Sequence, residues 1–286
     1  MVPKPGHLFP LLFLLVACIG AIPPFIIHLL LRPHVYLVST ASLRTRFSHA
    51  KTAFFYFAWR FVSPIMDRDD GPHKAALLAQ AYGTVLEIGA GVGDNIKYLT
   101  RNRITRLVLV EPNIHMHAAL RKKANAADFR EDQGSLLLLG CGAAAPQEAE
   151  LTEAGFRPES VDCVLTVHVL CSLPQPASTI ELYRRLLRPG GLLIFYEHVK
   201  SEDESTAAWQ DVYTRYIWRE AMDGCELDRP TGAWIMNGAA AAETHEGGAL
   251  PAAFDKKRWT KCDIGKPKGQ NKYTCLPHVQ GIAVKA

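Results

Sequence analysis

The residues best suited to chemistry lie at the end of an apolar run, in residues 85–93 (VLEIGAGVG). Glu87 falls inside the run, where a buried carboxylate needs a cationic or N–H partner. Gly89, Gly91 and Gly93 allow a tight turn and a close approach of the backbone to a ligand. Their G-x-G-x-G spacing differs from the G-x-G-x-x-G spacing of dinucleotide-binding proteins. The segment therefore predicts a buried strand that runs into a ligand-binding turn.

A second acid stands at the end of the next apolar run. Glu111 directly follows residues 107–110, which are all Leu or Val, and comes 22 residues after Gly89. An acidic residue at the tip of a second strand, at about this distance, is typical of side chains that bind the hydroxyl groups of a ribose. Together with the glycine turn, the two acids predict a site for an adenosine-containing cofactor.

A sheet is needed to bring these residues to one edge. Short apolar runs predict strands at residues 85–88, 107–110, 136–139, 161–167 and 192–196, and two final strands at 259–264 and 279–285. A segment with helical composition leads into the first strand, at residues 74–82, and others follow strands one, two and four, at residues 94–102, 115–123 and 179–187. This alternation predicts an α/β fold with a doubly wound, mostly parallel, seven-stranded sheet. Ligands of such sheets bind at the carboxyl ends of the strands.

After residue 209 the pattern weakens: residues 209–222 are expected to form one long helix, and residues 238–253 a loop or a poorly ordered helix. The aromatic residues of the first segment are available for a substrate wall: Trp209, Tyr213, Tyr216 and Trp218.

Three more titratable side chains follow expected strands four and five. They are His168, Glu197 and His198. Each is a candidate for orienting or deprotonating a substrate at the same edge of the sheet. A structural role, capping a strand end or bonding the backbone, is at least as well supported for each of them.

The N-terminal part of the chain has a different composition. Residues 8–31 are apolar and long enough to span a hydrocarbon core as a helix, although Pro23 and Pro24 are expected to kink or break it. Before Asp67 the chain carries six Lys or Arg and no Asp or Glu, and its overall net charge is +4. A basic, apolar leader predicts attachment to an anionic membrane surface rather than nucleic-acid binding.

Three arrangements of this leader remain open: a spanning helix with the chain from Arg32 onward in the cytosol, a re-entrant hairpin, and a signal peptide cleaved near Ala21. Residues 43–66 combine aromatic and basic side chains, which is typical of a helix in the headgroup layer or of a lid over a substrate mouth. We therefore divide the chain into a membrane anchor (1–36), an interfacial or lid region (37–70) and an α/β domain (71–286).

The cysteines and basic residues exclude several other classes. Seven cysteines, an odd number without a C-x-x-C pair, predict reduced and mostly buried thiols, and Cys171 is expected to be one of them. No Cys/His pairing has the local spacing of a zinc site, so no metal is predicted. The α/β domain has no Arg/Lys cluster interleaved with aromatic residues, so no nucleic-acid partner is predicted either.

The glycine turn, the second acid and the turn at residues 186–191 (LLRPGG) resemble class I S-adenosylmethionine-dependent methyltransferases. Residues 169–172, 197–199, 223–227 and 277–285 resemble, more specifically, the membrane-anchored thiol methyltransferases of endoplasmic reticulum and lipid droplets. The resemblance covers residues 83–285, with a departure at 232–273. It implies a Rossmann-like methyltransferase fold that binds S-adenosylmethionine.

The resemblance also implies a set of cofactor-binding residues. Those expected around the methionine part are Glu87, Gly89, Ala90, Gly91 and Gly93. Those expected around the ribose and adenine are Glu111, Pro112, Asn113, Cys141 and Gly142. The backbone of His168 is expected to face the cofactor's amino group. Ala143 stands where the family often has an acid, and His168 stands where the subfamily usually has an apolar residue.

The implied activity is methyl transfer to a small lipophilic acceptor, a thiol, at the membrane of the endoplasmic reticulum or a lipid droplet with the catalytic domain in the cytosol. Two alternatives stay open. One is O- or N-methylation of a lipid or quinone-like acceptor. The other is an inactive cofactor-binding scaffold at the membrane, against which the intact Glu87, glycine turn and Glu111 count.

Overall fold

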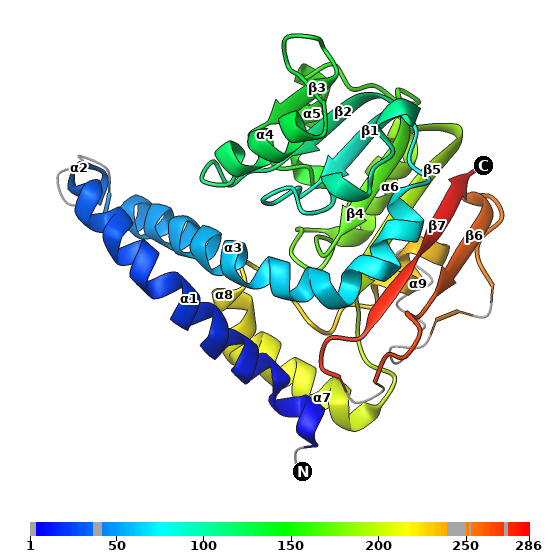
Figure 1. Cartoon of the computed structure of the whole chain (residues 1–286). Helices are drawn as coiled ribbons and strands as arrows, with labels where there is room; N and C mark the ends of the chain where they lie inside the picture. Colours follow the sequence, from blue (N-terminus) through cyan, green and yellow to red (C-terminus); the bar gives the residue numbers. More distant parts are fainter. Residues whose placement is uncertain (1–3, 37–41, 239–249, 252, 272–273) are drawn as a thin grey trace.

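A seven-stranded sheet forms the centre of the computed structural model, which describes residues 4–36, 42–238, 250–251, 253–271 and 274–286 (Figure 1). In chain order, its strands are β1 (Gly83–Ile88), β2 (Ile104–Val110), β3 (Leu136–Leu139), β4 (Val161–Val167), β5 (Leu187–His198), β6 (Trp259–Gly265) and β7 (His278–Lys285). Across the sheet, they lie in the order β3-β2-β1-β4-β5-β7-β6. The first five strands are parallel, and β7 is antiparallel to both of its neighbours. The predicted doubly wound, mostly parallel sheet is confirmed.

The strand order places a crevice beside β1. The chain leaves β1 towards β2 on one side, whereas β4 pairs with β1 on the other side. The loops after β1 and β4 therefore diverge, and such a switch point is where ligands bind in open α/β sheets. Both loops carry residues that the sequence singled out.

Helices cover both faces of the sheet. One apolar core joins the sheet to α5 (Glu148–Glu153), α6 (Pro176–Leu186) and α9 (Thr231–Asn237). The other joins it to the C-terminal end of α3 (Leu43–Leu78) and to α4 (His117–Ala126). Side chains of β1 alternate between them, because Leu86 belongs to the first core and Val85 to the second.

Two long helices precede the sheet and pack along each other. α1 (Phe9–Leu31) is followed by the short α2 (Pro33–Tyr36), and α3 returns beside α1 before bending towards the sheet (Figure 1). A Cβ atom at Gly20 would lie 2.2 Å from the Phe61 ring, so glycine is required where these helices touch. The expectation that Pro23 and Pro24 break the first helix is wrong, since α1 continues through both while packed on α3.

The second long helix also differs from expectation. α3 runs without interruption across the boundary predicted at residue 70, and it includes the start of the helix predicted at 74–82. It contains Pro64 and Pro72. As a result, one element connects the aromatic N-terminal segment to the edge of the sheet.

One further helix was predicted with the wrong form. Residues 94–102 form two 3₁₀ turns, Ile96–Tyr98 and Arg101–Arg103, because the Asn95 side chain is bonded to Glu87 and the chain is extended at Leu99. The long helix predicted at 209–222 is present: α7 (Glu204–Tyr213), a π-helical turn (Thr214–Trp218) and α8 (Arg219–Ala221) follow one another without a break. The loop or poorly ordered helix predicted at 238–253 lies mostly outside the described residues.

Candidate active site

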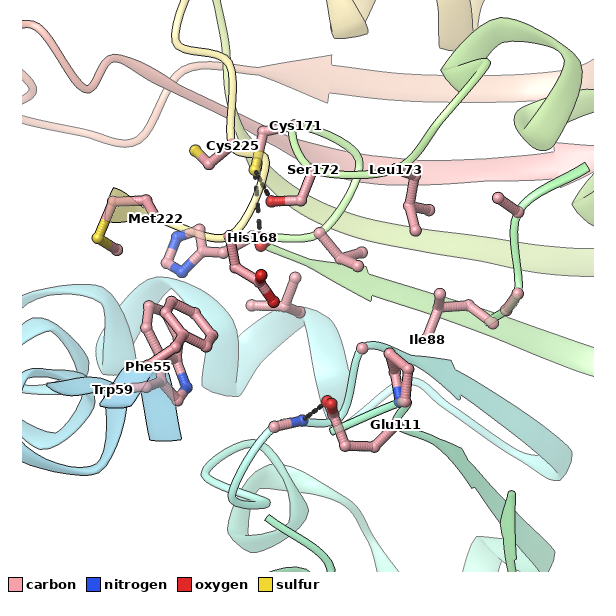
Figure 2. A pocket seen from close by; sticks show the side chains of 18 of the residues that line it. Phe55, Trp59, Ile88, Glu111, His168, Cys171, Ser172, Leu173, Met222 and Cys225 are labelled. Atoms are coloured by element: carbon pink, nitrogen blue, oxygen red, sulfur yellow. Dashed lines mark hydrogen bonds between the residues drawn. The ribbon is translucent and has the colours of Figure 1, made fainter. Parts of the chain in front are cut away.

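A cavity of about 480 Å³ lies at the carboxyl ends of β1, β2 and β4. Its polar end is formed by the glycine turn, Glu111 and the loop that follows β3. Its apolar wall comes from α1, α3 and the segment around α8, with Phe13, Phe55, Trp59, Met66, Trp218 and Met222. Figure 2 shows Phe55 and Trp59 across the cavity from the loop that carries Cys171 and Ser172.

The glycine turn keeps the floor of the cavity open. Gly89 and Gly91 have φ angles of +60° and +56°, a conformation that L-residues with a Cβ rarely adopt. A Cβ on Gly89 would lie 2.5 Å from Cγ2 of Val169, and one on Gly91 would lie 3.1 Å from Nε1 of Trp59. Gly93 packs away from the cavity, against Leu120 of α4.

Glu111 is fixed at the tip of β2 by backbone donors. Its Oε2 accepts the N–H of Gly91 at 2.8 Å, as Figure 2 shows, and its Oε1 accepts the N–H of Asn113 at 2.8 Å. Burial raises the pKa of this carboxyl, and the two backbone N–H groups lower it. Each oxygen keeps a further acceptor position for a ligand hydroxyl. Pro112 lines the cavity, while the Asn113 amide donates to the carbonyl of Thr52.

Glu87 lies behind the cavity floor. Its Oε1 accepts the Asn95 amide at 2.9 Å, and its Oε2 has no hydrogen-bond partner within the described ranges. Burial raises the pKa of the Glu87 carboxyl to about 7. Lys74 donates to Asn95 and pairs with Asp67, so the carboxyl sits near a buried ammonium group.

A small recess of about 40 Å³ adjoins the cavity on the α3 side. Ala90, Lys74, Asn95 and Asp70 line it together with Gly89 and Gly91, which also line the cavity. Sequence reasoning missed these α3 side chains. Their signal was the acidic cluster that begins at Asp67, where a leader without acids ends.

His168 lies at the junction of the cavity and the recess. Its φ of +55° places it in the left-handed region, and its Nε2 is 3.6 Å from Oδ2 of Asp70. The Tyr196 hydroxyl donates to the other oxygen of Asp70 at 2.8 Å, and His278 lies with its ring centre 5.0 Å from that of His168. Burial lowers the pKa of His168 well below its usual value. The imidazole is therefore held neutral, and burial makes it a weaker base than a histidine in water.

Glu197 holds the loop after β4 and does not line the cavity. Its carboxylate accepts the N–H groups of Val169, at 3.0 Å, and of Leu170, at 3.2 Å. Burial raises the pKa of Glu197 to about 8. His198, the next residue, does line the cavity, and its Nε2 is 3.1 Å from Sγ of Cys225.

The structure thus brings part of the expected set together. The expected residues that line the cavity are Gly89, Gly91, Glu111, Pro112, Gly142, His168 and His198. Those that lie behind its wall are Glu87, Gly93, Asn113, Cys141 and Glu197, and Ala90 faces the recess. Of the aromatic residues after 209 that the sequence offered for a substrate wall, Trp218 is in the wall and Tyr216 is exposed to solvent.

Comparison with known proteins identifies the family to which this chain belongs. Residues 59–234 match the model of the family described as "Methyltransferase domain". Thiol S-methyltransferase TMT1B of Homo sapiens is 30% identical over 194 residues, covering 65% of this chain and 74% of the relative. Thiol S-methyltransferase TMT1A of Homo sapiens is 31% identical over 147 residues, covering 51% of this chain and 55% of the relative.

A solved structure, an O-methyltransferase family protein from Burkholderia thailandensis, superposes with a TM-score of 0.53 at 16% identity, covering 92% of this chain and 71% of its own. That likeness shows the fold. The family match extends over more than half of the chain and contains the glycine turn, Glu111 and the end of β5. The chain therefore belongs to the class I S-adenosylmethionine-dependent methyltransferases, in the family of the thiol S-methyltransferases.

Proposed function

We propose that this methyltransferase is membrane-associated and methylates a small lipophilic acceptor, a thiol. The observation that carries the proposal is the composition of the cavity. One end is built from the glycine turn and Glu111, and the other is an apolar wall contributed by the two N-terminal helices. A single space thus joins a polar site at the sheet edge to an aromatic site beside the predicted anchor.

The residues at the polar end fit S-adenosylmethionine. The positive φ angles of Gly89 and Gly91 leave the floor free of side chains, and the Glu111 carboxylate can accept ribose hydroxyl groups. Gly142, beyond β3, leaves similar space for the adenine. Lys74 in the adjoining recess offers an ammonium group to an amino-acid carboxylate. When bound, the cofactor supplies a methyl group from a sulfonium centre.

The apolar end fits a hydrophobic acceptor. Phe55, Trp59 and Trp218 give flat, apolar surfaces that exclude water, and water exclusion and positioning supply much of the catalysis in a methyl transfer. A thiol needs only mild assistance to lose its proton, since its usual pKa is near 8.5. His168 takes the role of proton acceptor because it lines the cavity beside Asp70, whose carboxylate can stabilise the protonated ring. Glu197 becomes a positioning residue through the loop that it holds.

The outer face of α1 supports membrane attachment. The helix at Gly6–Leu31 is long and apolar enough to cross a membrane. Phe13, Ala17 and Ala21 are buried in the protein, whereas Leu15 and Ile19 are 57% and 63% exposed. This two-sided pattern favours a helix that lies in the membrane surface with α3 over one that spans the bilayer. We place the α/β domain in the cytosol, at the endoplasmic reticulum or a lipid droplet.

A methyl-transfer assay tests this function. The protein in detergent is incubated with radiolabelled S-adenosylmethionine and with matched hydrophobic thiols, phenols and amines. We expect label on the thiols, and at least ten-fold less with Glu111→Ala than with Glu131→Ala, a control at an exposed ion pair. Label on phenols or amines alone would replace the thiol with an O- or N-acceptor. No transfer to any acceptor, with cofactor binding retained, would support the inactive scaffold.

A further inference from the structure

Three side chains with metal-ligating atoms converge at the cavity. Cys171 comes from the loop after β4, His198 ends β5, and Cys225 follows α8. One ligand atom from each lies within 4.8 Å of the other two. All three residues are at most 6% exposed, and all three line the cavity. Figure 2 shows Cys171 and Cys225 together at its edge.

The chemistry of this set is that of a zinc site with an open position. Zn²⁺ is bound by thiolates and imidazoles, and catalytic zinc sites use three protein ligands while the fourth position holds water or substrate. We propose that Cys171, His198 and Cys225 bind one Zn²⁺ ion whose fourth position faces the cavity. Sequence reasoning excluded a metal because these ligands lie 27 residues apart in both intervals, without a short local motif.

The distances are compatible with zinc. Zn–S bonds of about 2.3 Å and Zn–N bonds of about 2.0–2.1 Å in a tetrahedron place ligand atoms about 3.5–3.8 Å apart. The His198 Nε2 to Cys225 Sγ distance is 3.1 Å, and all three ligand atoms fall inside the 4.8 Å limit. Reaching the zinc geometry from these separations requires changes of about 1 Å or less between ligand atoms.

Groups around the sulfur atoms suit thiolate ligands. The indole N–H of Trp218 donates to Cys225 Sγ at 3.1 Å, and the Ser172 hydroxyl lies 3.5 Å from Cys171 Sγ. Donors of this kind orient and stabilise metal-bound thiolates. The Nδ1 atom of His198 is buried without a hydrogen-bond partner in the part of the chain that the structure describes. Because Nε2 is the atom that faces Cys225 Sγ, Nε2 is the zinc ligand, and Nδ1 then needs a separate acceptor, as the second ring nitrogen of a metal-bound histidine usually has.

The open position gives the ion a role in the proposed function, on which this step rests. An acceptor thiol in the cavity would displace the zinc-bound water. As the Zn–S bond forms, the S–H bond breaks and its proton passes to a base in the cavity, for which His168 is placed. The product is a zinc-bound thiolate, held among the residues of the apolar wall. Selection of soft thiols over phenols and amines follows from the same ligand chemistry.

Metal content and cobalt spectroscopy test the site without reference to activity. We would purify the full chain in detergent without a polyhistidine tag and measure zinc by mass spectrometry. We expect about one zinc per chain in the wild type. After removal of zinc by a chelator, Co²⁺ should give sulfur-to-cobalt charge-transfer bands and the visible bands of a tetrahedral site. A hydrophobic thiol should shift those bands by entering the open position.

Two cysteine variants and one control make the test specific. Cys171→Ala and Cys225→Ala should each weaken Zn²⁺ affinity at least ten-fold, whereas Cys262→Ala, at a half-buried thiol on β6, should leave it unchanged. Circular dichroism and tryptophan fluorescence show whether each variant is folded, independently of cofactor binding. Zinc below one tenth per chain, with no cobalt spectrum, would overturn the proposal. So would equal zinc in the three variants, or a Cys171–Cys225 disulfide in freshly purified protein.

The metal site and the methyltransferase function can fail separately. Zinc binding without cofactor binding would retain the site and reject the function. Cofactor binding and methyl transfer at full rate in zinc-free protein would retain the function and reject the role of the ion.

Discussion

Gly89→Ala tests whether the glycine turn is shaped by close contact with the loop after β4. The backbone at Gly89 has a φ of +60°, and an alanine Cβ would lie 2.5 Å from Cγ2 of Val169. The left-handed conformation costs a non-glycine residue about 1–2 kcal/mol. Overpacking in a dense interior typically costs about 1–3 kcal/mol more. We therefore expect Gly89→Ala to lower the free energy of unfolding by about 2–5 kcal/mol.

Gly134→Ala is the matched control. Gly134 has a φ of +69°, but no atom lies within 4 Å of the Cβ that alanine would add. It should show the backbone cost alone, about 1–2 kcal/mol. The difference between the two variants then measures the contact with Val169.

A double variant locates that contact directly. Val169→Ala removes the methyl group that meets the new Cβ, although its own Cβ stays 3.1 Å away. We expect the double variant Gly89→Ala/Val169→Ala to lose less free energy of unfolding than the two single variants lose together, because substitutions at residues in contact do not have additive effects. Additive losses would show that the two loops do not touch as described.

The assay combines urea unfolding of the detergent-solubilised chain, followed by tryptophan fluorescence, with calorimetry of S-adenosylmethionine binding. Affinity for the cofactor should fall at least ten-fold in Gly89→Ala and stay within two-fold of wild type in Gly134→Ala. Equal losses of stability and equal affinities in the two variants would refute the geometry assigned to the turn.

Three further changes probe the buried acid, the proton acceptor and the membrane face. Burial raises the pKa of Glu87 from 4.5 to about 7, so the folded chain keeps a proton that the unfolded chain releases. The free energy of unfolding should therefore fall by up to about 3 kcal/mol as pH rises from about 4.5 to 7. In urea titrations, Glu87→Gln should flatten this pH dependence, whereas the control Glu131→Gln should keep it. Parallel pH profiles for the two variants would contradict the raised pKa of Glu87. Asp70→Asn should lower kcat about 10–100-fold and change its pH profile while cofactor affinity in calorimetry stays within two-fold; an unchanged kcat would remove Asp70 from the proton path. Leu15→Lys with Ile19→Lys should lower binding to anionic vesicles at least ten-fold in flotation assays and leave cofactor affinity unchanged; undiminished flotation would exclude this face as the membrane contact.

Strand periodicity was sufficient to predict the sheet, but helix ends depended on contacts between distant segments. Residues 161–167 were predicted as a strand and form β4 with the same bounds, since a run buried on both faces has an unambiguous pattern. Residues 94–102 were predicted as a helix, yet Asn95 turns its side chain to Glu87 and the helix does not form. Pro64 and Pro72 obscured the continuity of α3, which tertiary packing maintains.

The candidate site was also predicted only in part: its residues within one βαβ unit were identified, and its contacts between distant segments were not. Gly89, Gly91 and Glu111 were identified from spacing along one βαβ unit, and they face the cavity together. The acceptor wall, the pairing of His168 with Asp70 and the cysteine–histidine trio each join segments far apart in the chain. Local spacing carries no information about such pairs, because they meet only when the loops after β4 and β5 pack against α3 and α8.

Binding of S-adenosylmethionine to the full chain in detergent, followed by calorimetry, is the direct test of the site at the glycine turn. We expect one cofactor per chain and at least ten-fold weaker binding in Glu111→Ala, because the carboxylate at the tip of β2 lines the cavity and is positioned by the N–H groups of Gly91 and Asn113. No binding to the wild type, or equal binding to Glu111→Ala, would contradict the assignment of this cavity to the cofactor.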